Sequence, residues 1–139
     1  MQDLSRRSFL SAAAAALASD LDFPLVDFHV HLDSIVTLEK ALEISRRLGV
    51  KFGIVEHAGK AIHKYANLIS SDEQLTRYAA GLKPHPVFVG IQAEGIDWME
   101  CFSKAALRQL DYALTDALTL PEKNGELVRI WTPRVRIDD

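Results

Sequence analysis

Short apolar segments alternate with longer amphipathic ones along most of the chain. The apolar segments have the length and composition of strands, and they lie at residues 26–31, 52–57, 86–95 and 111–116. The segments between them have helical periodicity or helix-capping residues, and they lie at residues 37–48, 62–68, 71–80 and 97–109. Strands that alternate with helices are typical of a parallel sheet or barrel. The pattern therefore predicts an α/β fold with about four parallel strands.

Local signals mark where the predicted helices begin and end. Gly49 and Gly81 are expected to end the first and second long helices, because glycine is common just past a helix C-terminus. Capping residues mark the helix starts, in the pairs Ser70–Glu73, Ser71–Gln74 and Asp97–Glu100. Nearer the C-terminus, Asn124-Gly125 separates two apolar runs and predicts a hairpin-like segment whose second arm is residues 127–131.

The first strand carries two histidines at its carboxyl end. Side chains alternate between the two faces of a strand. We therefore expect one face to carry Val26, Phe28 and Val30, and the other to carry Asp27, His29 and His31. Two imidazoles that are two residues apart share one face and can bind one metal ion together.

Later strands also end in residues that bind metals. His57 ends the second strand, Glu94 the third and Asp116 the fourth. Because the carboxyl ends of parallel strands meet at one edge, we expect a divalent metal site there. The predicted ligands are His29, His31, His57, Glu94 and Asp116. For Asp116 a loop or hairpin carboxylate is an equal alternative.

Three basic residues follow the second strand. Lys60, His63 and Lys64 could bind a small anionic substrate beside the metal site, or they could form a solvated helix face. No catalytic residue is assigned apart from the metal ligands.

Four motifs follow one another over about residues 24–118: Asp27-x-His29-x-His31, Ile54-Val55-Glu56-His57, Gly90-x-x-x-Glu94-Gly95-Ile96-Asp97 and Leu110-Asp111-Tyr112. They resemble the successive motifs of the polymerase-and-histidinol-phosphatase (PHP) superfamily. The resemblance implies a distorted (β/α)7 barrel with two or three zinc, manganese or iron ions. It also implies phosphoester hydrolysis by a metal-activated hydroxide, with His29, His31, His57 and Glu94 as ligands and Glu94 bridging two ions.

The chain departs from this family in its second half. The family usually has a histidine after the fourth strand, where this chain has Asp116. Its later His and Asp-x-His ligands have no counterpart before Asp139. We therefore expect a partial (β/α) barrel of the PHP type: a fragment, a truncated product or a half barrel completed by another chain. An open strand edge would favour self-association.

Two other functions remain open. The first is an amidohydrolase-type enzyme, because that superfamily also has His-x-His after its first strand. Such enzymes also have a metal-bridging lysine on a later strand, and none of the predicted strands here ends in lysine. Alternatively, the chain is a metal-binding remnant without activity, because the later ligands are missing.

The N-terminus resembles an export signal. Ser5-Arg6-Arg7-Ser8-Phe9-Leu10 is similar to the twin-arginine motif, and Ala16-Leu17-Ala18 fits a small-x-small cleavage pattern. We expect residues 1–18 to be the signal and residues 19–139 the hydrolase-like domain. This implies a periplasmic or extracellular protein, often exported already folded and loaded with metal. An alanine-rich helix packed on the domain is the alternative.

Composition limits the partners. The net charge of −3 does not indicate nucleic-acid binding. No apolar run reaches 18 residues, so no stable membrane anchor is expected. The one cysteine, Cys101, cannot form an intramolecular disulfide, and we expect it to be a small buried hydrophobic residue.

Overall fold

The computed structural model describes residues 24–116, 119–121 and 126–129. The predicted export signal and the Asn124-Gly125 turn lie outside the described residues.

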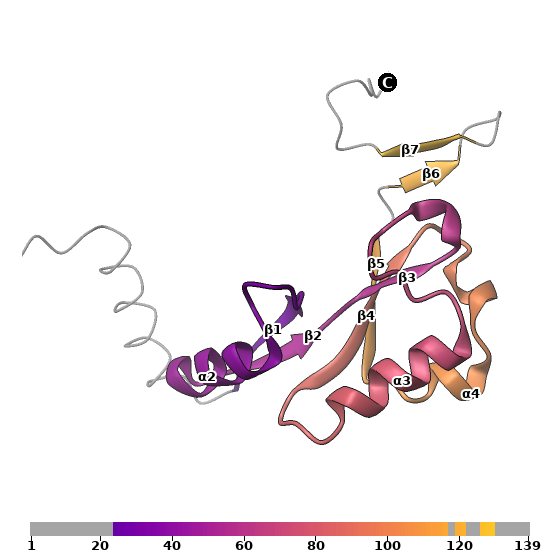
Figure 1. The fold of residues 1–139 in the computed structure, drawn as a ribbon. Helices are drawn as coiled ribbons and strands as arrows, with labels where there is room; N and C mark the ends of the chain where they lie inside the picture. The colour runs from indigo at the N-terminus through magenta and orange to yellow at the C-terminus, as the bar shows by residue number, and fades with distance from the viewer. Residues whose placement is uncertain (1–23, 117–118, 122–125, 130–139) are drawn as a thin grey trace, which may run out of the picture.

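The fold is α/β and is built on a curled parallel sheet (Figure 1). Its strands are β1 (Leu25–Val30), β2 (Val50–Ile54), β3 (His57–Gly59), β4 (Phe88–Glu94) and β5 (Tyr112–Asp116). β2 and β3 pair with β4 in one continuous register, so they form a single strand position that is interrupted between them. Adjacent strand positions therefore follow chain order, which confirms the predicted parallel arrangement of four positions.

Helices connect the strands and cover one face of the sheet, which we call the helix face. The helices that cover it are α2 (Leu38–Leu48), α3 (Asp72–Leu82) and α4 (Lys104–Leu107). Two 3-10 turns, η1 (Ala61–His63) and η2 (Trp98–Cys101), lie in the connections after β3 and β4. The predicted stop at Gly49 is confirmed, since this residue adopts φ 66° and its N–H donates to Ser45 O. Ser71 caps α3 by accepting a hydrogen bond from Gln74 N, as one of the two capping boxes predicts.

Three helix predictions are wrong in extent. Residues 62–68 form only the short turn η1 rather than a helix. Gly81 does not end α3, which continues to Leu82 with Lys83 as its C-cap. A glycine can remain inside a helix when the chain stays right-handed there.

The predicted helix over residues 97–109 is also broken, into η2 and α4. The Asp97 side chain makes no capping hydrogen bond because it forms an ion pair with Lys60. Ser103 instead caps α4, accepting from Ala106 N at 3.2 Å.

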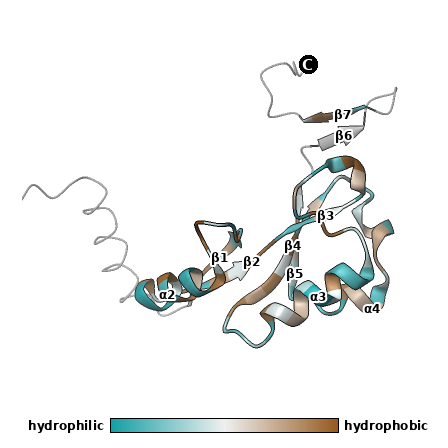
Figure 2. Ribbon diagram, viewed as in Figure 1, coloured by the Kyte–Doolittle hydropathy of each residue, from teal (hydrophilic) through white to brown (hydrophobic). Residues whose placement is uncertain are grey.

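The hydrophobic core lies on the helix face. One cluster packs under α2 and α3, and its buried members are Ala41, Phe52, Ile54, Ala79, Leu82, Val87 and Val89. A second packs under α3 and α4, and its buried members are Ala58, Ile69, Leu75, Ile91, Phe102 and Ala106. Figure 2 shows hydrophilic residues on the outward-facing sides of the helices.

Tyr78 on α3 closes the interruption between β2 and β3. Its hydroxyl lies 3.0 Å from Ile54 O and 2.9 Å from Gly90 O, and its single proton is shared between these two carbonyl acceptors. Carbonyl groups near a strand break would otherwise be buried without a partner, which is costly. This contact lets the sheet continue past the break.

The opposite face of the sheet carries Gly53 and Gly90, and we call it the glycine face. The Tyr112 ring covers both glycines, and a Cβ added at Gly90 would lie 2.2 Å from Tyr112 Cζ. The Tyr112 hydroxyl donates to Phe28 O at 2.7 Å. Burial raises the pKa of Tyr112, with smaller contributions from Asp27 and Asp111, so the hydroxyl keeps its proton.

The predicted division of faces along β1 is wrong at Phe28. Its ring contacts Phe88 and Tyr112 on the glycine face, whereas Val30 packs against the core on the helix face. The cause is a register shift between Asp27 and Val30, where β1 has one more residue than β2. Such a bulge reverses the alternation of side chains.

A small antiparallel sheet of β6 (Thr119–Pro121) and β7 (Leu127–Arg129) follows β5. It confirms the predicted hairpin-like segment.

Candidate metal centre

Four predicted ligands come together on the glycine face near the carboxyl ends of the strands. His29 is in β1, His31 lies one residue past that strand and Glu94 ends β4. The prediction that His57 ends the second strand is wrong: His57 begins β3, and that strand continues to Gly59. Hydrogen bonds through Gln92, also on β4, connect three of these side chains, and the fourth joins them through Glu94. The curled sheet thus brings together residues that are up to 65 positions apart in the sequence.

Gln92 is the centre of this network. Its Oε1 accepts from His29 Nε2 at 2.8 Å and from His31 Nε2 at 3.0 Å. Its Nε2 donates to Glu94 Oε1 at 3.1 Å. The sequence analysis missed Gln92, although a signal was present. Residues two apart on a strand share a face, so a ligand at Glu94 implies that Gln92 faces the same site.

Glu94 is a buried carboxylate with one unpartnered oxygen. It is 0% exposed, and its Oε1 accepts from His57 Nδ1 at 2.7 Å. Its Oε2 is buried and has no hydrogen-bond partner among the described residues. A buried charged oxygen without a partner is costly, and a bound cation would compensate for this cost.

The imidazole of His57 lies between two other rings. It stacks on His31 with ring centroids 4.8 Å apart and on Tyr65 with centroids 3.7 Å apart. Its side chain remains 22% exposed. The ring is therefore held in one orientation while an edge can still be reached from solvent.

Glu56 is the second residue that the sequence analysis did not assign to the site. It lies in the interruption between β2 and β3, directly before His57. One ligand atom from each of His31, Glu56 and His57 lies within 4.8 Å of the others. A strand break is not visible in the sequence pattern, because residues 52–57 read as one continuous strand.

For Asp116, the fifth predicted ligand, the strand register gives the position of the backbone. β5 pairs with β4 so that Asp116 stands opposite Glu94, at the last position of both strands. Its role as a ligand stays a prediction.

The three residues predicted to bind an anionic substrate lie in different environments. Lys60 Nζ forms ion pairs with Asp97 at 2.6 Å and Glu100 at 2.7 Å. These two carboxylates raise the pKa of Lys60, whose charge is already neutralised. His63 is buried beside Gly95, and Lys64 is exposed with φ 54°. Their substrate-binding role stays a prediction.

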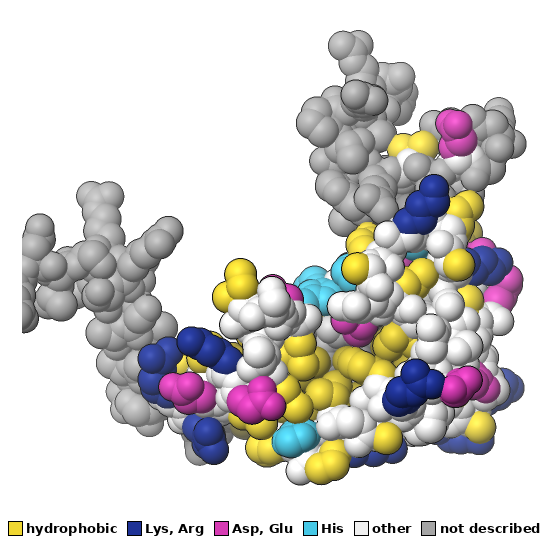
Figure 3. Space-filling view, viewed as in Figure 1, with side chains coloured by type: hydrophobic (Ala, Val, Ile, Leu, Met, Phe, Trp, Pro, Cys, Tyr) yellow, Lys and Arg dark blue, Asp and Glu magenta, His cyan; other side chains and the backbone are white. Residues whose placement is uncertain are grey.

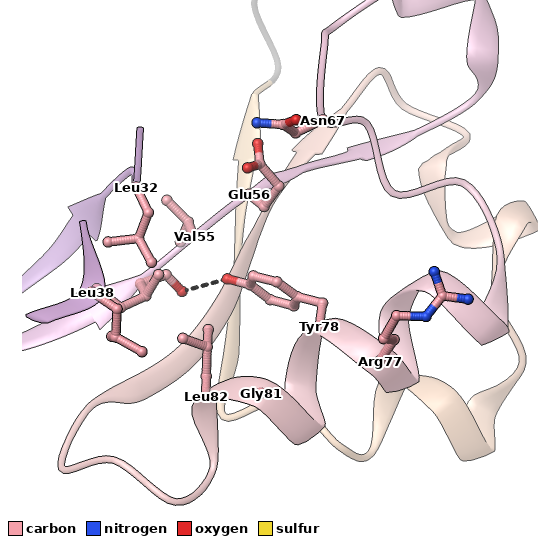
Figure 4. Close-up of a pocket in the computed structure, with 10 residues that line it drawn as sticks. Leu32, Leu38, Val55, Glu56, Asn67, Arg77, Tyr78, Gly81 and Leu82 are labelled. Atoms are coloured by element: carbon pink, nitrogen blue, oxygen red, sulfur yellow. Dashed lines mark hydrogen bonds between the residues drawn. The ribbon is translucent and has the colours of Figure 1, made fainter. Parts of the chain in front are cut away.

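A pocket of about 420 Å³ lies on the helix-face side of the sheet, and Glu56 is one of the residues that line it (Figure 4). Leu32, which follows His31, and Glu56, which precedes His57, are among the residues that line it. Figure 4 shows Glu56 and Asn67 at one end, and Leu38, Tyr78 and Leu82 farther down. In the space-filling view, histidine side chains group above a hollow with a largely hydrophobic floor (Figure 3).

Comparisons with known proteins identify no relative. No family model, no curated protein and no solved structure matches the chain. Among the described residues, no helix is long and apolar enough to cross a membrane.

Proposed function

We propose that the protein is a metal-dependent hydrolase, with phosphoesters as the substrate class. The observation that carries the proposal is the convergence of His29, His31 and His57 with the buried Glu94. Imidazole nitrogens and carboxylate oxygens are the donor set that zinc, manganese and iron accept in hydrolytic sites. The unpartnered Glu94 Oε2 also fits a cation at this place.

The choice of phosphoesters depends on the sequence motifs. The Asp-x-His-x-His motif and the later strand ends resemble the PHP superfamily, whose members hydrolyse phosphoesters. A bound divalent ion supplies Lewis acidity there, lowering the pKa of water and neutralising negative charge on a phosphoryl group.

The chain's own residues orient the donor atoms. Glu94 accepts from His57 Nδ1, which leaves Nε2 of that ring for a ligand. Gln92 fixes the rings of His29 and His31 through one shared oxygen. These hydrogen bonds hold the imidazole rings in fixed orientations in the absence of an ion. The rings then lose less conformational entropy when an ion binds.

A metal-free remnant is the second candidate, and the neutral amide of Gln92 favours it. This amide already satisfies one nitrogen of both His29 and His31 without any ion. Metal content separates the two candidates.

The first test measures zinc and manganese content by elemental analysis of the purified full chain. We expect the His29→Ala/His31→Ala variant to lose most of its bound metal, because the substitution removes two of the four proposed ligands. His85→Ala is the matched control, because His85 precedes β4 at the opposite end of the sheet. Equal metal content in wild type and the double variant would refute metal binding at this site.

Activity is tested separately with an aryl phosphomonoester and added manganese. Hydrolysis by wild type that the double variant loses is the expected result. A chain that binds metal through these histidines but does not hydrolyse the ester would refute the phosphoesterase assignment, and it would support the metal-binding remnant without activity that the sequence leaves open.

A further inference from the structure

Glu56 lies where a metal ligand would be expected, although it is not among the ligands predicted from the sequence. The interruption of the second strand position places it between the end of β2 and the start of β3. One oxygen of its carboxylate and one nitrogen from each of His31 and His57 lie within 4.8 Å of one another. Small side-chain rotations would bring all three to ligand distance of a single ion, which is about 2.0–2.2 Å for zinc.

The three donors match a known class of site. Two imidazoles and one carboxylate form the protein ligands of many hydrolytic zinc sites, which keep a further position open for water or substrate. Glu56 supplies the negative charge, and it also lines the pocket of about 420 Å³. One of the three proposed ligands therefore borders the pocket.

Two hydrogen bonds hold the donors in place. Glu56 Oε1 accepts from His57 N at 2.9 Å, which fixes the carboxylate beside its neighbour. The carboxylate of Glu94 accepts from His57 Nδ1 at 2.7 Å, so Nε2 of that ring is the nitrogen left for a metal. In this arrangement Glu94 Oε1 acts on the ion through His57.

We propose that Glu56 is a metal ligand in a site with His31 and His57, and that Glu94 positions the His57 ring through its Oε1. This inference rests on the proposed metal-dependent function. It adds a ligand that the family resemblance does not supply.

The test is a calorimetric titration of the full chain with zinc, which measures the zinc affinity. Glu56→Gln is the informative variant, because its amide keeps an oxygen that can accept from His57 N while the negative charge is removed. We expect its zinc affinity to fall at least about tenfold, by comparison with the 10- to 100-fold cost of removing a ligand's partner. The metal-free thermal midpoint should stay close to that of wild type.

Glu43→Gln is the matched control, an exposed glutamate on α2 whose zinc affinity should equal that of wild type. If Glu56→Gln binds zinc like wild type while His31→Ala and His57→Ala lose it, the assignment of Glu56 is overturned and the proposed function stands. If wild type binds no zinc or manganese, the proposed function fails and this inference fails with it.

Discussion

Tyr112 and Gly90 show how strongly single residues determine the shape of the glycine face. The tyrosine ring lies so close to Gly90 that no side chain fits between them. From this position its hydroxyl reaches Phe28 O across the sheet. The pair thus connects β5 to β1, the strand that carries His29 and ends just before His31.

We expect Gly90→Ala to destabilise the protein by about 1–3 kcal/mol, the usual cost of forcing extra volume into a packed site. The added methyl group would displace the Tyr112 ring and weaken its bond to Phe28. Urea unfolding measures the effect.

Gly81→Ala is the opposite control for this prediction. Gly81 lies inside α3, and an added Cβ would meet nothing within 4 Å. Alanine there should stabilise the protein by up to about 1 kcal/mol, because glycine has the larger conformational entropy in the unfolded chain. Changes of the same sign in both variants would contradict the packing explanation.

At the scale of elements, α3 and α4 are joined at their N-termini. The Asp72 carboxylate at the start of α3 accepts from Ser103 N at 2.8 Å, and Ser103 is the N-cap of α4. Hydrogen bonds from the side chain and backbone of Ser103 hold the pKa of Asp72 below its ordinary value of 3.8. The link fixes both helices against the second core cluster.

This link predicts a pH dependence of stability. Because the folded-state pKa of Asp72 is depressed, its contribution is complete above the unfolded pKa and is lost as the pH falls through the folded value. The stability difference between wild type and Asp72→Ala should therefore be constant near neutral pH and shrink below about pH 4. Urea unfolding at several pH values measures it, and a difference that stays constant down to pH 2 would contradict the assignment.

At the scale of the whole molecule, the sheet has two edges. Within the described residues, β1 pairs only with β2, and β5 pairs only with β4. Edge strands present free N–H and C=O groups to other chains. The self-association expected from the sequence therefore has two candidate edges, and it stays a prediction.

We expect sedimentation velocity to show concentration-dependent assembly of the wild-type chain. Ala113→Lys places a charge at an exposed position of β5, and it should shift the distribution toward the monomer. Gln109→Lys, before β5, adds the same charge outside a strand and serves as the control. A wild-type chain that is monomeric at every concentration would refute assembly through these edges.

The alternation of strands and helices, the stop at Gly49 and the cap at Ser71 were predictable because they depend on neighbours in the chain. The ends of the later helices were not. Asp97 could have capped a helix, but Lys60, brought close by the fold, binds its carboxylate instead.

The same division applies to the site. The sequence by itself determined that His29, His31, His57 and Glu94 share one end of the sheet, because parallel strands align their carboxyl ends. Only the tertiary structure decided that Gln92 connects them and that a strand break brings Glu56 beside His31 and His57. The tertiary structure also decided the bulge in β1 that turns Phe28 toward Tyr112. Bulges and breaks depend on how distant segments pack, and a local pattern of polar and apolar residues contains no record of that packing.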